Sequence, residues 1–122
     1  MKINAHKKLK EIQEEFQEKF PYLKIEFYAG HHTAGEGSPV KEALDPQLTI
    51  EEVRTVRKEG NLFIRGDMEV ETVEQKFYEE YGLNVQVFRR SGKLWMQTSA
   101  TDQWTLDKQN RKGGHSEALA GD

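Results

Sequence analysis

The chain contains no cysteine among its 122 residues, which excludes a disulfide framework, a thiolate metal site and a cysteine nucleophile. It also lacks an apolar run near the ~18 residues that cross a bilayer, and its first residues lack the apolar stretch of a signal peptide. Leu, Ile, Val and Phe are scarce and supply only 27 residues. Acidic and basic side chains nearly cancel, at 21 and 18, so we expect one soluble, cytoplasmic domain rather than a disordered chain.

An internal repeat organises the sequence, because two stretches carry apolar residues at the spacing i, i+3, i+7 and i+11. This spacing keeps the side chains on one face and predicts amphipathic helices over 7–20 and 68–81. Acidic residues fill the sides expected to face solvent, including Glu14 in the first helix and Glu71, Glu74 and Glu79 in the second. The two apolar sets are Leu9, Ile12, Phe16 and Phe20, and Val70, Val73, Phe77 and Tyr81.

The flanks of the two helices also match. Alternating apolar and polar residues predict half-buried strands over 23–27 and 83–87, and short extended stretches (2–5 and 62–66) precede the helices. Thr49 and Thr105 each favour the start of a short helix, and Thr49 with Glu52 fits a capping box. Gly60 and the pair Gly113–Gly114 are expected to end these short helices.

We therefore predict an α+β fold built from two strand–helix–strand units, roughly 1–60 and 62–114. The units are expected to share one mainly antiparallel sheet with both long helices on one face, as in a ferredoxin-like or related two-layer sandwich. A β-grasp arrangement fits less well, because it needs a hairpin before the helix. Residues 1–114 then form a single domain, and 115–122 form a flexible C-terminal tail.

The stretch 88–95 predicts a hairpin with a turn at Ser91–Gly92. A two-residue turn pairs Val87 with Met96 and buries Leu94, Met96 and Thr98, whereas a three-residue loop reverses these faces. We favour the two-residue turn. The opposite sheet face is then polar with an aromatic rim, and either the 29–46 segment or the short helices cover it, or it is an open interaction surface. Its candidate binding residues are Tyr28, Phe88, Arg89, Arg90, Trp95 and Gln97.

The residues over 88–95 and 98–106 resemble a family of small, uncharacterised bacterial proteins. The resemblance covers about a third of the chain, mainly the second unit. It implies a bacterial protein of unknown function and supplies no catalytic residues.

The 29–46 stretch differs most between the units, and such insertions commonly form functional loops. His31, His32 and Glu36 offer nitrogen and oxygen ligands for a divalent metal, although their spacing also suits a glycine-rich solvated loop. No serine lies in a nucleophile-elbow context, and no phosphate-binding loop is present. We expect no resident cofactor, and the sequence favours a protein without enzymatic activity.

The leading hypothesis is a non-enzymatic binding or self-association module that acts through the aromatic-rimmed sheet face, with a second copy or another protein as partner. One alternative is a small ligand or divalent metal bound at the 29–46 loop. Another is RNA or single-stranded DNA bound by the 88–95 hairpin, which the acidic pI of about 5.8 disfavours. No membrane partner is expected.

Overall fold

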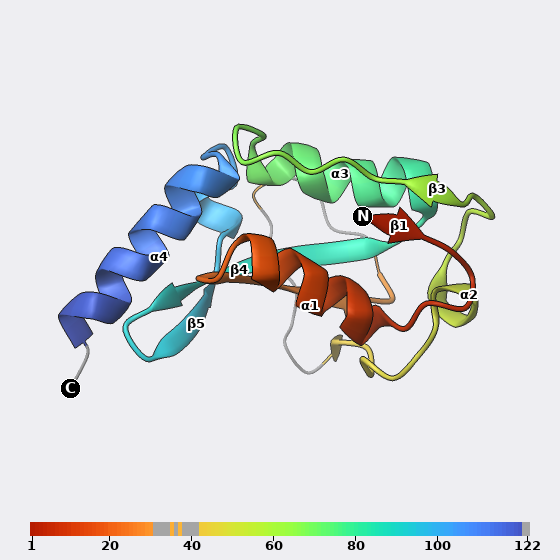
Figure 1. Cartoon of the computed structure of the whole chain (residues 1–122), viewed down its shortest axis with the longest axis horizontal. Helices are drawn as coiled ribbons and strands as arrows, with labels where there is room; N and C mark the ends of the chain where they lie inside the picture. Colours follow the sequence, from red (N-terminus) through yellow and green to blue (C-terminus); the bar gives the residue numbers. More distant parts are fainter. Residues whose placement is uncertain (31–34, 36, 38–41, 121–122) are drawn as a thin grey trace.

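The computed structural model describes residues 1–30, 35, 37 and 42–120. Its centre is a three-stranded antiparallel sheet in the order β2–β4–β5 (Figure 1). The strands span Leu23–Tyr28 (β2), Asn84–Ser91 (β4) and Leu94–Gln97 (β5). The predicted strands over 23–27 and 83–87 are therefore confirmed, and the pairing of β2 with β4 joins the two units.

Both long helices cover the same face of this sheet. Helix α1 spans Leu9–Lys19 and α3 spans Val70–Tyr81, close to the predicted ranges. Their apolar stripes share one buried cluster with the alternate strand residues of that face, and the rings of Phe27 and Phe77 meet edge to face at 6.3 Å. The predicted amphipathic helices are thus confirmed, and the scarce apolar residues form one shared core.

The prediction of one sheet is wrong for the described residues, which form two. The first strands of the two units, β1 (Lys2–Ile3) and β3 (Gly60–Asn61), pair only with each other, so neither joins β2–β4–β5 as a ferredoxin-like order requires. The physical reason lies just before each long helix, where carbonyl groups of Ala5 and Lys7 accept bonds from Glu51 and Ile50. Backbone groups engaged in this way cannot extend a strand into the main sheet.

The start of each long helix is hydrogen-bonded to the start of a later helix in the same unit, an arrangement we call a helix joint. The later helices are α2 (Ile50–Val53) and α4 (Leu106–Ala120), the latter preceded by the 3-10 turn η2 (Ser99–Thr101). In the first joint Leu9 N bonds to Leu48 O and Ile50 N to Lys7 O. The four bonds of each joint correspond one to one: Leu9–Leu48, Lys10–Pro46, Ile50–Lys7 and Glu51–Ala5, against Val70–Trp104, Glu71–Asp102, Leu106–Met68 and Asp107–Gly66.

Helix α4 runs through Gly113 and Gly114 to Ala120, so the predicted helix stop and the tail starting at 115 are both wrong. Gly113 is buried against the first residues of β2, and a Cβ placed there would lie 3.0 Å from both Cβ and O of Tyr22. The glycine therefore permits close approach of helix and strand rather than ending the helix. Ser116, one turn further on, donates to Arg90 O at 2.9 Å.

The hairpin has the favoured two-residue connection, but it lies one residue later than predicted. Ser91 pairs with Leu94 and Arg90 with Trp95, and the turn is at Gly92–Lys93, where Gly92 has the left-handed φ of 64°. A shift of this kind moves the pairing by two residues and leaves the faces unchanged. Thr98 is buried as predicted, whereas Leu94 and Met96 are exposed because α1 and α3 end short of the hairpin tip.

Candidate interaction surface

The sheet face opposite α1 and α3, which we call the outer face, is largely closed. Tyr28 and Phe88 are only 3% and 4% exposed, so these two aromatics do not form an open rim. Two described parts of the 29–46 segment approach the sheet: Ala43 bridges to Tyr28 at the edge of β2, and a Cβ on Gly37 would be 2.3 Å from Gln97 Oε1. The 29–46 segment therefore contributes to the covering of this face near Gln97.

Three buried polar atoms on β2 and β4 have no hydrogen-bond partner within the described residues. They are Tyr28 Oη, Asn84 Oδ1 and Gln86 Oε1, and Tyr28 and Asn84 face each other across the ladder. Burial, together with the nearby Glu26 carboxylate, raises the pKa of Tyr28 to about 12. Buried polar atoms without hydrogen-bond partners reduce stability, so the outer face is expected to contribute less to stability than the apolar face that packs on α1 and α3.

Trp95 is the one predicted rim aromatic that reaches the surface, and two cations flank its ring. Lys24 Nζ lies 5.2 Å and Arg90 Cζ 4.9 Å from the ring centroid. Lys24 Nζ is also 5.2 Å from the ring of Phe88, and Arg90 is held from the other side by Glu117 at 2.8 Å. These cation–π contacts fix Trp95 at the hairpin end of the outer face.

Arg89 belongs to the opposite side of β4 and is not a free surface cation. Its Nη1 donates to Gln109 Oε1 of α4 at 2.8 Å, and its guanidinium lies 5.4 Å from the ring of Trp104. Partial burial lowers its pKa, although an arginine stays charged. The structure therefore separates Arg89 from the other predicted binding residues and joins it to α4.

Glu74 closes the edge of β4 beyond the end of β5. Its carboxylate accepts from Val87 N at 2.9 Å and from Gln86 Nε2 at 3.4 Å, and the residue is only 8% exposed. The prediction that Glu74 faces solvent is therefore wrong, because the strand edge offers an unpaired N–H that a carboxylate can satisfy. Gln13 of α1 closes the edge of β2 in a similar way, through Ile25 O and Glu26.

Within the described part of the chain, β4 is the only strand that pairs with β5, so β5 is an edge strand of the sheet. Its four residues contain no proline and no charge, and Leu94 and Met96 are 73% and 37% exposed. Natural edge strands are commonly protected by charges, proline or bulges. This edge has none of these, which marks it as a surface suited to pairing with another strand.

The predicted metal ligands His31, His32 and Glu36 lie outside the described residues. Within the described ranges, no group of three or more His, Asp or Glu side chains is arranged to hold a metal ion. No helix in those ranges is long and apolar enough to cross a membrane.

No family model, no curated protein and no solved structure matches the chain. The candidate surface is therefore identified from the geometry of the described residues.

Sequence reasoning did not identify Leu94, Met96 or Trp104 as surface features. Leu94 and Met96 have the alternation of a buried strand, and nothing local shows that the helices stop before the hairpin tip. The contact of Trp104 could have been predicted from the sequence, because Lys108 lies four residues after it. In the structure the Lys108 ammonium is 4.0 Å from the ring centroid.

Proposed function

We propose that the protein is a non-enzymatic self-association module in which the β4–β5 hairpin pairs with the same hairpin of a second copy. The observation that carries the proposal is the unprotected edge of β5 with Leu94 and Met96 exposed. Strand addition at such an edge supplies main-chain hydrogen bonds, and the exposed side chains supply apolar contact.

The hairpin geometry supports a specific register for this pairing. Because Ser91 and Leu94 flank a two-residue turn, the backbone groups of Trp95 point away from β4. A twofold antiparallel pairing centred on Trp95 brings Leu94 of one copy beside Met96 of the other. Lys93 then lies opposite Gln97, so no like charges are directly opposed across the strands.

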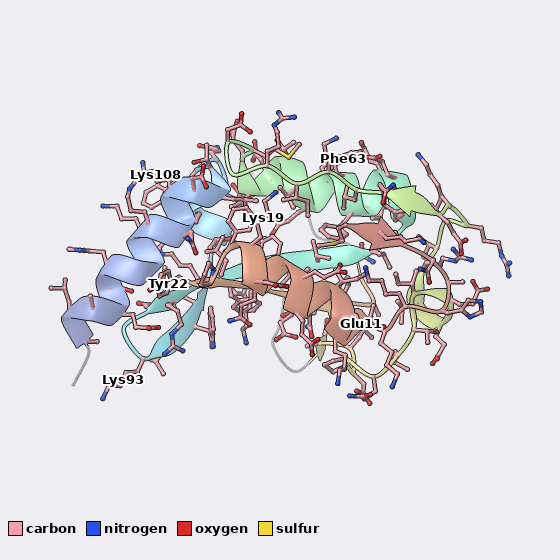
Figure 2. All side chains as sticks on the ribbon, in the orientation of Figure 1. Glu11, Lys19, Tyr22, Phe63, Lys93 and Lys108 are labelled. Carbon is pink, nitrogen blue, oxygen red and sulfur yellow. The ribbon has the colours of Figure 1, made fainter. Side chains whose placement is uncertain are left out.

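The oligomeric state measured by light scattering after size exclusion tests this proposal. We expect the mass to rise from 14.2 kDa toward twice that value as concentration increases, and Leu94→Lys to stay monomeric. Phe63→Lys is the matched control, because Phe63 is also 73% exposed but lies away from the hairpin (Figure 2). A monomer at all concentrations, or equal effects of the two variants, rejects the proposal.

The other binding hypotheses draw less support. Arg89 and Arg90, which an RNA or single-stranded DNA ligand of the 88–95 hairpin would need, are already engaged with Gln109 and Glu117. A partner other than a second copy would use the same β5 edge, and Leu94→Lys would also abolish its binding.

The matched helix joints support a second part of the proposal, that the chain arose by duplication of a strand–helix–strand–helix unit. The turns that precede the joints match as well: Lys7 N bonds to Asn4 O where Met68 N bonds to Arg65 O, and Leu48 N to Asp45 O where Trp104 N bonds to Thr101 O. Eight joint bonds in the same order are difficult to obtain from unrelated segments.

A further inference from the structure

Charge is unevenly distributed along this chain. The whole protein has a formal charge of −3, but residues 88–116 contain six basic and two acidic side chains. These residues form the hairpin, η2 and most of α4, which lie together at one end of the molecule (Figure 1). An overall acidic protein therefore has a basic end.

Several basic side chains of this end lie on α4. Lys108, Arg111, Lys112 and His115 follow one another at helical spacing, and the last three are exposed. None of the four forms an ion pair with a described residue. We call these four residues the α4 basic stripe.

Helix α4 contains two acidic residues, Asp107 and Glu117. The carboxylate of Glu117 binds Arg90 at 2.8 Å, and that of Asp107 lies against the backbone of Gly66. Because Glu117 is paired with Arg90 and the stripe itself forms no ion pair with a described residue, the positive charge of the stripe is available to an external anion.

An aromatic ring lies one turn before the stripe. Trp104 is partly exposed, with Lys108 Nζ at 4.0 Å and Arg89 Cζ at 5.4 Å from its centroid. Arg89 is fixed by Gln109, whereas Lys108 projects from the helix surface (Figure 2). A base can therefore stack on Trp104 when Lys108 turns to a phosphate, which is the combination used by proteins that bind single strands.

We propose that the α4 basic stripe and Trp104 bind the phosphate backbone of single-stranded nucleic acid. Charge complementarity supports this partner, and the surface does not suit a bilayer. The exposed side of α4 offers one large apolar residue, Leu119, whereas membrane-surface helices bury a broad apolar face. The proposal uses neither Leu94 nor Met96, so it stands independently of self-association through β5.

The intrinsic fluorescence of Trp104 provides a direct test. The chain has two tryptophans, so Trp95→Phe leaves Trp104 as the sole reporter and keeps an aromatic ring between Lys24 and Arg90. We expect an oligo-uridine of about 16 nucleotides to quench this fluorescence at low salt. With the three cations Lys108, Arg111 and Lys112 at phosphates, the logarithm of the affinity should fall with the logarithm of the salt concentration with a slope of about −2.

Charge reversal shows whether the stripe is the binding site. In the Trp95→Phe background, Arg111→Glu with Lys112→Glu should weaken binding by about tenfold or more and flatten the salt slope. The matched control reverses two exposed cations elsewhere, Lys10→Glu with Arg57→Glu, and should weaken binding by about twofold at most because the same change in net charge acts only at long range. Circular dichroism verifies that both pairs fold.

Three outcomes would overturn the proposal. They are no quenching at low salt, equal losses for the two charge-reversal pairs, and binding of a duplex as tight as that of the single strand. Phosphatidylserine vesicles provide a further arm, because binding to vesicles without binding to the oligonucleotide would assign the stripe to a membrane surface instead.

Discussion

The two halves of the chain, residues 1–60 and 62–120, form equivalent backbone contacts but use different side chains to close the strand edges. Both joints use equivalent backbone hydrogen bonds. At the strand edges, however, the first half places an amide on the helix and a carboxylate on the strand, Gln13 and Glu26, whereas the second places Glu74 and Gln86 at the corresponding positions. Backbone geometry therefore constrains this architecture more tightly than side-chain identity does.

The halves also differ beyond the joint. Helix α2 ends after four residues, whereas α4 continues for fifteen and docks on the hairpin. The contacts of this extension are mostly polar: Asn110 Oδ1 accepts from Tyr22 N, and Ser116 Oγ accepts from Gly92 N. The second half thereby supplies the hairpin, the β5 edge and the basic stripe, while the first half supplies mainly core.

The largest expected effects come from core positions that correspond between the halves. Phe16→Ala and Phe77→Ala each remove a ring that is at most 1% exposed, and each should lower the free energy of unfolding by about 3–5 kcal/mol. Urea unfolding followed by circular dichroism should show a single transition for both variants. Two transitions, with only one moved by each variant, would mean that the halves do not share a core.

The substitution Gly113→Ala should have the next largest effect. It tests the packing of the extended part of helix α4, which has no counterpart in the first half. A methyl group at position 113 meets the backbone O of Tyr22, so Gly113→Ala should destabilise the protein by about 1–3 kcal/mol. Gly114→Ala is the control: its nearest contact is the movable ring end of Tyr22, at 2.8 Å. Thermal unfolding with equal losses for the two variants would contradict the close-approach role of Gly113.

Substitution of Glu74 and Gln13, which close the strand edges, should have smaller effects on stability, and the loss at Glu74 should be the larger of the two. Glu74→Ala leaves the buried Val87 N–H without its carboxylate and should cost about 1–3 kcal/mol. Gln13→Ala should cost about 0.5–1.5 kcal/mol, because the Ile25 carbonyl that it exposes can bind water. Glu74→Gln retains an acceptor and should lose less than Glu74→Ala. Chemical denaturation at neutral pH measures all three, and an equal loss for Glu74→Gln would exclude the hydrogen-bond explanation.

The smallest effect at neutral pH is expected at Tyr28, which corresponds to Phe88 in the second half. Its buried hydroxyl has no described partner, so Tyr28→Phe should change stability by no more than about 0.5 kcal/mol, or increase it slightly.

The same variant should have a clear effect at alkaline pH. The pKa of Tyr28 rises from 10.0 to about 12 on folding, so the unfolded chain releases this proton first. Stability should therefore fall as pH increases from about 10 to 12, and less steeply in Tyr28→Phe. Urea midpoints across this range test the expectation; identical slopes in the two proteins would contradict it.

The helices and strands of the core were predictable because their periodicities extend over several turns or residues. Thr49 and Thr105 also precede helices as predicted, and Thr105 Oγ1 accepts from Lys108 N. The separate pairing of β1 with β3 was not predictable, because it depends on backbone bonds to distant segments. Gly113 was misread because a glycine required for close packing and one that ends a helix look identical in sequence.

The candidate surface was predictable only in part. The sequence correctly placed Trp95 on the outer side of the hairpin with Gln97, because strand alternation fixes the face. It could not show that Arg90 is paired with Glu117, or that Leu94 and Met96 extend beyond the ends of α1 and α3. Those outcomes depend on how far each helix reaches in space.

The helix joints have a consequence for the order in which the protein folds. Every bond of a joint lies within one half, whereas the β2–β4 ladder connects the halves. Each joint closes a loop shorter than the span that the ladder must bring together, and shorter closures lose less chain entropy. The joints are therefore expected to form before the ladder, so that a growing chain could close its first half while the residues of β4 are still being added.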